Sequence, residues 1–532
     1  MTTPSARASA RSPAGFAARP AAAVEDVQEA SIADLQAAMA SGQMKARDLV
    51  LKYAERIKTL DQDGPHVRSV IELNPDALAI ADALDSERSA KGARGPLHGI
   101  PILLKDNIDT GDKMLTTAGS LALVGTRPPQ DAPVAKGLRD AGAIIFGKTN
   151  LSEWANFRST HSTSGWSGRG RQCLNPYVLT HNPCGSSSGS AAAVAASFAA
   201  AALATETDGS IVCPAHACGI VGIKPTVGLT SRAGVVPIAH SQDTVGPHGR
   251  TVADAAAVLG ALTGVDSRDP ATAASAGKFQ KDYTQYLDPN GLRGARIGVA
   301  RETFWGYSAD ADKICEAAIA AMKAAGAVIV DPADIPTAND IVSSPEFDVL
   351  LYEFKADLNQ YLTTRVRNEQ FLNVPDLRTL EQIIAFNEAI AEVEMPYFGQ
   401  EIFVLAQEKG PLTDKAYLDA LAKDHQISRE QGIDAVMDKL NLDALVAPTG
   451  QPAWPTDLLN GDHFLGASSS PAALAGYPLI TVPAGFSRGL PVGITFMGRA
   501  FSEPTLIKLA YAFEQSTKAR RAPQFRATLE LP

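Results

Sequence analysis

The longest apolar stretch of the chain predicts a buried helix that leads into a short strand. Almost every residue from 191 to 204 is apolar, and most are alanine, the residue with the highest helix propensity. A helix that is apolar on all sides must lie in the interior of a protein. We therefore expect a core helix that begins near Ser188 and a strand over 202–205. Turns of small residues, at 185–189 and 207–211, lie at the two ends of this unit.

Helical periodicity dominates the part of the chain before this unit. Ser31, with Asp34 three residues later, resembles an N-cap, and spaced apolar residues up to Leu60 predict two amphipathic helices. A third helix is expected over 74–90. The next elements are expected to be buried strands at 100–104 and 142–146, and a loop at 147–154 that leads into a helix.

Strands and helices alternate through the rest of the chain. The interval 336–432 is mostly polar and helical in pattern, with many aromatic residues. The apolar patterns elsewhere predict strands at 219–225, 295–300, 327–330, 444–446, 479–482 and 492–497, and helices at 251–262, 309–325 and 503–515. This alternation predicts an α/β fold with a largely parallel or mixed sheet.

The domain organisation follows from length and local composition. The chain has 532 residues, more than a usual single domain, but no long linker rich in Pro, Gly or Ser divides it. Its first 25 or so residues are rich in Ala, Ser, Pro and Arg and lack the apolar content needed for a folded core. We predict a disordered tail over 1–27 and a single domain over 28–532.

Composition and charge narrow the classes of function. Hydrophobic residues make up 45% of the chain and charged residues 20%, which is typical of soluble proteins. The net charge of −10 argues against a nucleic-acid partner, because phosphate binding favours a basic surface. No apolar stretch has the length of a membrane span, so no membrane partner is expected.

The five cysteines are expected to be reduced thiols, because an odd number in a long chain does not suggest a disulfide framework. The N-terminal stretch also lacks the continuous apolar core of a secretory signal. A cytoplasmic location is therefore predicted, or a periplasmic or secreted one if a signal has been removed. A zinc site at 213–218 is disfavoured, since that segment offers only three candidate ligands. The cysteines are Cys173, Cys184, Cys213, Cys218 and Cys315.

Candidate chemistry lies at the strand end and at the two small-residue turns. Lys105 directly follows the predicted strand at 100–104, where it either reaches the surface or is buried with a lowered pKa and acts as a general base. Ser210 is the candidate nucleophile, and the backbone N–H groups of Thr207, Asp208, Gly209 and Ser210 form a plausible oxyanion hole. No histidine lies in a comparable motif. Lysine must then be the base, with a serine of the first turn relaying the proton.

These motifs resemble the amidase signature family. The resemblance rests on GIPILLKDN, GSSSGSA and TDGSI, and further similar blocks cover nearly the whole chain from Ser31. It implies a central mixed β-sheet covered by helices on both sides. It also implies a catalytic unit in which Ser210 is the acyl-forming nucleophile, Ser186 a bridging serine after a cis peptide bond, Lys105 the neutral base and Ser187 a hydrogen-bond partner of the lysine. Such a mechanism needs no metal and no organic cofactor.

Finer motifs indicate a subgroup. CGSSSGSA, ETDGSIVCP and NLSEWANFRS resemble the peptide amidases, which hydrolyse C-terminal carboxamides of peptides and release ammonia. The expected partner is thus a small-molecule or short-peptide amide, the interval 336–432 is expected to determine the substrate, and Asp208 is expected to contact an amide or ammonium group. We expect a monomer or a homodimer.

Three alternatives stay open. The first is a broad-specificity amidase, aryl acylamidase or carbamate hydrolase on the same scaffold. The second is a protein similar to glutamyl-tRNA amidotransferase A, although such proteins usually carry a double glycine that this chain lacks. The third is a non-catalytic module that binds phosphate at the Gly/Ser turns.

Overall fold

A mixed β-sheet forms the centre of the molecule. The computed structural model describes residues 26–529, and within that range eleven strands join one sheet in the order β1-β4-β2-β5-β7-β6-β12-β13-β11-β8-β9. The strands β2, β4 and β5 run parallel to one another, as do β8, β9 and β11, whereas the other pairs are antiparallel. The strands are β1 Val70–Leu73, β2 Pro101–Lys105, β4 Ile144–Thr149, β5 Ala201–Glu206, β6 Val221–Lys224, β7 Thr244–Gly249, β8 Arg296–Val299, β9 Val328–Val330, β11 Ala444–Pro448, β12 Leu479–Ser487 and β13 Leu490–Met497.

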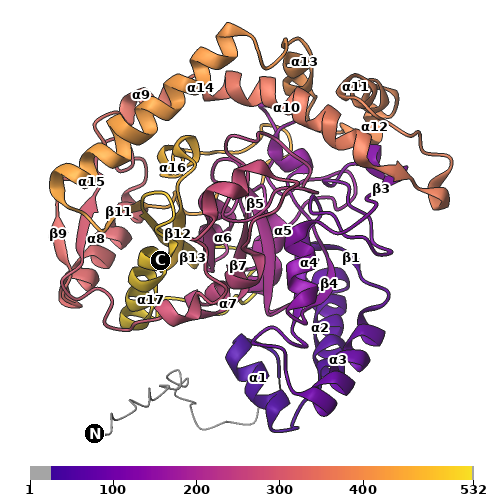
Figure 1. The fold of residues 1–532 in the computed structure, drawn as a ribbon, viewed down its shortest axis with the longest axis horizontal. Coiled ribbons are helices and arrows are strands. Elements are labelled where there is room, and N and C mark those ends of the chain that lie inside the picture. The colour runs from indigo at the N-terminus through magenta and orange to yellow at the C-terminus, as the bar shows by residue number, and fades with distance from the viewer. Residues whose placement is uncertain (1–25, 530–532) are drawn as a thin grey trace, which may run out of the picture.

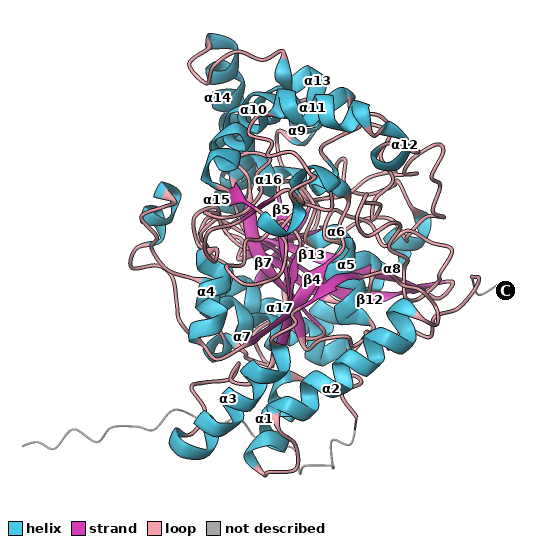
Figure 2. Cartoon of the chain, turned by 90° about the vertical axis from the view of Figure 1, so that its right-hand side faces the viewer, coloured by secondary structure: helices cyan, strands magenta, loops and turns pink. Residues whose placement is uncertain are grey.

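Helices cover both faces of this sheet, as Figures 1 and 2 show. In β11, Ala444 and Val446 join an apolar cluster with α7, α8 and α17, while Leu445 and Ala447 join another with α9, α15 and α16. Successive strand residues point to opposite faces, so both faces are buried. The expected α/β fold is confirmed. These helices are α7 Val252–Leu262, α8 Ala309–Ala324, α9 Ala338–Val342, α15 Asp434–Leu440, α16 Ser470–Ala475 and α17 Glu503–Thr517.

The predicted core helix and strand are α5 (Ser188–Ala195) and β5. All eight residues of α5 are buried, as are all six of β5. The helix packs so closely that a Cβ added at Gly189 would lie 2.3 Å from the carbonyl oxygen of Ser69. The two turns at the ends of this unit are therefore attached to a rigid part of the core.

The first predicted helices are also present. Ser31 caps α1 (Ile32–Ala40) in a capping box with Asp34, and α2 (Ala46–Arg56) follows. The third, α3 (Ala77–Lys91), begins later than expected, because the side chain of Asn74 hydrogen-bonds the carbonyl oxygen of Ile145 in β4. Nearly all of the predicted disordered tail, residues 1–25, lies outside the described residues.

Some local predictions were wrong. The strand β4 continues to Thr149, and the expected helix after it is only a short 3₁₀ segment, Glu153–Asn156, in which Trp154 and Ala155 have left-handed backbone angles. The strand β7, with the sequence TVGPHG, was not predicted, since its glycines and proline hide any alternation. The strand β1 and two further helices, α4 (Pro133–Asp140) and α6 (Val212–Ala217), were also missed.

The interval 336–432 is helical, as predicted, and much of it lies along one rim of the molecule (Figure 1). Phe354 of α10 and Phe403 of α13 pack with Trp154. The nearby Ser152 donates its N–H to the carbonyl oxygen of Ser186, in the turn at 185–189. A short strand, β10 (Val366–Arg367), pairs with β3 (Thr126–Arg127). The helices of the interval are α9, α10 Glu346–Thr364, α11 Leu380–Ala389, α12 Ala391–Glu394, α13 Glu401–Gln407 and α14 Lys415–Ser428.

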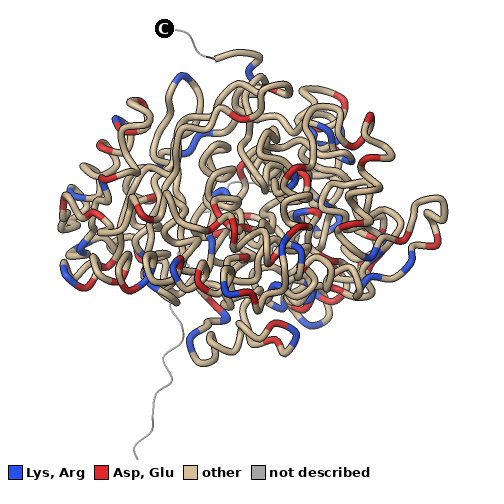
Figure 3. Tube along the Cα trace, turned by 90° about the horizontal axis from the view of Figure 1, so that it is seen from above, with Lys and Arg blue, Asp and Glu red and all other residues tan. Residues whose placement is uncertain are grey.

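Charged residues of both signs are interspersed along the described chain, as Figure 3 shows. None of the helices described is long and apolar enough to cross a membrane.

Candidate active site

The site begins with a lysine at the end of a central strand. Lys105 is the last residue of β2, its side chain is fully buried, and its Nζ lies 2.7 Å from Ser186 Oγ. Thr205, on the neighbouring strand β5, accepts hydrogen bonds from Nζ through its Oγ1 at 2.9 Å and its carbonyl oxygen at 3.3 Å. Burial lowers the pKa of Lys105 to about 7, although the negative charges of Asp243 and Glu206 act in the opposite direction. A substantial fraction of this lysine is therefore neutral near neutral pH.

The relay turn, residues 182–187, holds Ser186 against the core. The peptide bond between Gly185 and Ser186 is cis. The N–H of Ser152 donates to the carbonyl oxygen of Ser186 at 2.9 Å, and Ser188 Oγ donates to the carbonyl oxygen of Cys184 at 2.6 Å. Ser186 itself is 1% exposed, so its hydroxyl faces the lysine inside the protein rather than water.

The nucleophile turn, residues 207–213, follows β5 and leads into α6. Gly209 has φ +79°, a left-handed conformation that favours glycine. Glu206 Oε2 accepts from the N–H groups of Ile211 and Val212 at 2.6 and 2.9 Å, which fixes the start of α6 just after Ser210. Ser210 is 8% exposed.

The four residues expected to form the oxyanion hole keep their backbone donors unused. Thr207, Asp208, Gly209 and Ser210 donate no backbone N–H hydrogen bond to any residue in the described part of the chain. Thr207 is held by its side chain instead, since its Oγ1 donates to Asp243 Oδ1 at 2.6 Å. Unpaired N–H groups on a fixed turn are available to a developing negative charge.

The structure brings Lys105, Ser186 and the nucleophile turn together. The N–H of Ser187 donates to the carbonyl oxygen of Ser210 at 3.3 Å and joins the two turns. Ser210 Oγ itself hydrogen-bonds no residue in the range that the structure describes. Ser187 departs from expectation, because its Oγ donates to the carbonyl oxygen of Thr205 at 3.0 Å and not to the lysine. Its side chain turns toward β5, so it contacts the lysine's partner rather than the lysine.

The prediction of five reduced cysteines was wrong. Cys184 and Cys213 form a disulfide bond with their Cα atoms 5.9 Å apart, and Cys173, Cys218 and Cys315 are buried free thiols. The residues lie 29 positions apart in the sequence, and only the folding of the two turns onto each other reveals the pairing. In α6, His216 Nε2 lies 2.7 Å from the carbonyl oxygen of Gln451, and its Nδ1 accepts from the N–H of Gly493.

Acidic groups gather beside the nucleophile turn. Asp208 Oδ2 accepts from Ser470 Oγ at 2.6 Å, whereas its Oδ1 is buried without a hydrogen-bond partner. Burial raises the pKa of Asp208, although the hydrogen bond from Ser470 and the charge of Lys224 act in the opposite direction. Glu346 at the start of α10 has its pKa raised to about 8 by burial and by the charge of Asp208. The interval 336–432 therefore contributes an acidic group to the surroundings of Asp208.

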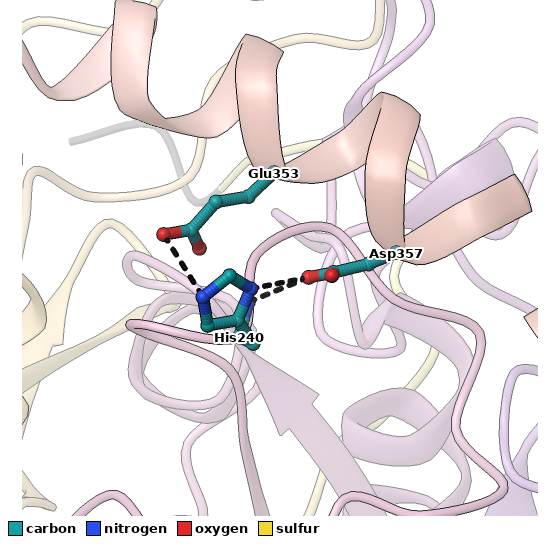
Figure 4. A group of neighbouring side chains, drawn as sticks. All are labelled: His240, Glu353 and Asp357. Carbon is teal, nitrogen blue, oxygen red and sulfur yellow. Dashed lines mark hydrogen bonds and ion pairs between the residues drawn. The ribbon is translucent and has the colours of Figure 1, made fainter. Parts of the chain in front are cut away.

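One further cluster, shown in Figure 4, has the composition of a metal site. His240 Nδ1 lies 2.8 Å from Asp357 Oδ2, and its Nε2 lies 3.5 Å from Glu353 Oε1. Glu353 Oε1 also accepts from Tyr417 at 2.7 Å. Burial lowers the pKa of His240, but the hydrogen bond to Asp357 and the charge of Glu353 outweigh this and raise it. The cluster is accounted for as ion pairs that fasten the 238–243 loop to α10.

Sequence reasoning missed the residues that support the lysine. Thr205 accepts from Lys105 Nζ and also from Asn107 Nδ2, the latter at 2.9 Å. Asp243 accepts from the N–H groups of Ile238 and Ala239 as well as from Thr207, so it links the 238–243 loop to the nucleophile turn. Thr205 immediately precedes the ETDGSI motif, and this position next to the motif was the one feature of the sequence that could have identified Thr205 as part of the site.

A buried lysine–serine pair next to a turn of free N–H groups can move a proton and stabilise a negative charge on oxygen, as the hydrolysis of an amide requires. The chain matches the family model described as Amidase over residues 48–507. The chain belongs to that family and is an amidase, a hydrolase that acts on amides.

Known proteins of this family resemble the chain closely. A probable amidase of Arabidopsis thaliana is 44% identical over 94% of this chain and 92% of its own. The crystal structure of native peptide amidase from Stenotrophomonas maltophilia is 52% identical and has a TM-score of 0.88, covering 93% of this chain and 99% of that one. A glutamyl-tRNA(Gln) amidotransferase subunit of Chloroflexus aurantiacus is 34% identical over 93% of this chain and 98% of its own.

Proposed function

We propose that this protein is a serine amidohydrolase with a Ser-cisSer-Lys catalytic unit, and that it hydrolyses C-terminal amides of peptides and releases ammonia. One observation carries the proposal. Lys105 Nζ lies 2.7 Å from Ser186 Oγ, and both of its other hydrogen-bond partners are oxygens of Thr205. A neutral amine has two N–H groups and one lone pair. With the N–H groups donated to Thr205, the lone pair faces Ser186 and can accept its proton.

Acylation begins when Ser210 Oγ attacks the carbonyl carbon of the amide. The proton of Ser210 passes to Ser186, whose own proton passes to Lys105, so Ser186 ends the step neutral and the lysine ends it charged. Collapse of the tetrahedral intermediate breaks the C–N bond. The leaving nitrogen takes a proton back along the same path and departs as ammonia, which leaves an ester between the acyl group and Ser210.

Deacylation repeats these steps with water. A water molecule attacks the ester carbonyl, and its proton moves through Ser186 to Lys105. When the tetrahedral intermediate collapses, the C–O bond to Ser210 breaks, the proton returns through Ser186 to Ser210 Oγ, and the free carboxylic acid departs. The N–H groups of Thr207, Asp208, Gly209 and Ser210 would stabilise the oxyanion in both halves, which is consistent with their having no other acceptor within the described residues. Proton transfer in both halves uses side chains of this chain and, in deacylation, a water molecule.

Two features favour peptide amides as substrates. The 52% identity to a peptide amidase exceeds the 34% identity to the amidotransferase protein. The helices of 336–432, which we infer to shape the substrate site, also bring Glu346 close enough to Asp208 to raise the pKa of Glu346. The unpartnered Asp208 Oδ1 would accept a hydrogen bond from the carboxamide or from an ammonium group of the substrate.

A broad-specificity amidase is the second candidate. It is favoured by the 44% identity to a protein described only as a probable amidase. The two candidates share the mechanism and differ in the substrate.

The test is ammonia release from a C-terminally amidated dipeptide by the full chain. Ser210→Ala serves as the control, and mass spectrometry of the free-acid product shows which bond was cut. Release that requires Ser210, with internal peptide bonds intact, supports the proposal. Turnover of aryl amides or carbamates without release from the dipeptide favours the second candidate. Full activity of Ser210→Ala refutes the catalytic unit itself.

A further inference from the structure

The proposed proton relay crosses from one turn to another, so it depends on how firmly the two turns are held together. Ser186 lies in the relay turn and Ser210 in the nucleophile turn, on opposite sides of α5 and β5 in the sequence. Each turn has its own internal hydrogen bond: Cys184 N–H donates to Asn182 Oδ1 at 2.7 Å, and Cys213 N–H donates to the carbonyl oxygen of Gly209 at 2.7 Å.

One backbone hydrogen bond and one disulfide connect the two turns within the described residues. The hydrogen bond from the N–H of Ser187 to the carbonyl oxygen of Ser210 is 3.3 Å long, near the limit for such a bond. Ser210 Oγ itself contributes no hydrogen bond to any described residue. The disulfide between Cys184 and Cys213 is the covalent connection, and it joins the residue two before Ser186 to the residue three after Ser210.

The backbone at Cys184 adopts a conformation that glycine would adopt more easily than cysteine. Its φ is +59°, in the left-handed region that favours glycine and strains other residues. A glycine would relieve this strain, whereas only a cysteine provides the sulfur atom that reaches Cys213. Both cysteines are buried, at 5% and 8% exposed, so the bond lies inside the protein beside the site.

We propose that Cys184 and Cys213 are positioning residues for catalysis, and that their disulfide sets the distance between the relay serine and the nucleophile. The proposal rests on the proposed function of Ser186 and Ser210. Loss of the bond then lowers the rate of the chemical step more than substrate binding, because a displacement of about 1 Å between reacting groups costs a large factor in rate. Turnover by this chain then requires that Cys184 and Cys213 are joined as the disulfide.

The experiment compares Cys184→Ala/Cys213→Ala with the wild type, and uses Cys315→Ala as the matched control. Cys315 is a buried free thiol of α8 that packs in an apolar cluster, and its Sγ lies 3.8 Å from the carbonyl oxygen of Gly493. For each protein, kcat and KM are measured on an amidated dipeptide, well below a Tm determined by circular dichroism. The rate at which a fluorophosphonate labels Ser210 is measured in parallel.

The expected result is a fall in kcat of about tenfold or more in the double variant, with KM changed by less than about threefold and slower labelling of Ser210. The control keeps wild-type values. A double variant that is folded and has wild-type kcat and labelling rate, with only a lower Tm, overturns the proposal, because the bond is then merely a structural crosslink.

If the double variant does not fold, reduction of the disulfide in the wild-type protein tests the proposal instead. Dithiothreitol converts the disulfide to two thiols and is itself oxidised to a cyclic disulfide, so two electrons and two protons are transferred. Alkylation and mass spectrometry count the new thiols in the folded protein. Loss of turnover that returns on reoxidation supports the proposal, and unchanged turnover with both thiols alkylated overturns it. If the wild type releases no ammonia in a reaction that depends on Ser210, the proposed function is wrong. The rates at which the fluorophosphonate labels Ser210 then still show whether the disulfide positions this serine.

Discussion

Substitution of Thr205 by valine tests how the lysine is held. Valine has the shape and the strand propensity of threonine, so β5 should keep its backbone. What is lost is Oγ1, which accepts from Lys105 Nζ at 2.9 Å and from Asn107 Nδ2 at 2.9 Å. The carbonyl oxygen of Thr205 remains, but its hydrogen bond with Lys105 Nζ is the longer of the two, at 3.3 Å.

The magnitude follows from these contacts. A buried donor without a partner costs about 1–3 kcal/mol. The loss of the partner of Asn107 should lower the free energy of unfolding. The loss of the partner of Lys105 leaves its lone pair poorly oriented and should raise the activation barrier. We therefore expect kcat/KM on an amidated dipeptide to fall by about 10- to 100-fold, which is about 1.4–2.7 kcal/mol in the barrier.

The control is Thr495→Val, which removes a buried hydroxyl from β13. Thr495 Oγ1 lies 2.8 Å from Thr449 Oγ1, and Thr449 keeps a second partner in Thr481 at 2.7 Å. This variant should lose about 1 kcal/mol of stability and keep its kcat/KM. A Thr205→Val enzyme with the same kcat/KM as the control would refute the role of Thr205 in orienting the lysine.

Three further predictions concern charge and proton transfer, and a fourth concerns substrate recognition. Because the pKa of Lys105 is about 7, kcat/KM should fall about tenfold per pH unit below that value as the lysine is protonated, and a flat profile down to pH 5 contradicts a neutral lysine base. Asp243→Asn removes a negative charge that raises the pKa of Lys105, so the acidic limb of the same profile should move to lower pH; a limb that moves to higher pH contradicts this. Lys105→Met should remain folded, because it replaces a buried amine with an apolar chain of similar length, yet lose at least about 10³-fold in kcat; activity within tenfold of the wild type would exclude the lysine as base. Asp208→Asn should lower kcat/KM on peptide amides about tenfold while aryl amides are affected less, and equal effects on both would remove Asp208 from substrate recognition.

The cysteines illustrate why part of the site was out of reach of sequence reasoning. Their number and spacing favour free thiols, because pairing depends on the approach of two turns separated by α5 and β5. Similarly, Asp243 supports the nucleophile turn from a loop 36 residues away through its bond to Thr207. Such contacts leave no periodic signal, since they are made by irregular segments.

The sequence by itself determined the elements that have strong local patterns and the identity of the chemical groups. The alanine-rich run predicted α5 and β5 because a helix without a polar side must be buried, and the apolar run at 100–104 placed Lys105 at the end of a buried strand. Only the tertiary structure decided which groups meet: Thr205 rather than Ser187 holds the lysine, Cys184 is bonded to Cys213, and Glu346 lies near Asp208. Local patterns record burial, which each residue experiences separately, whereas a hydrogen bond or a disulfide between distant segments depends on the packing of the whole sheet and its helices.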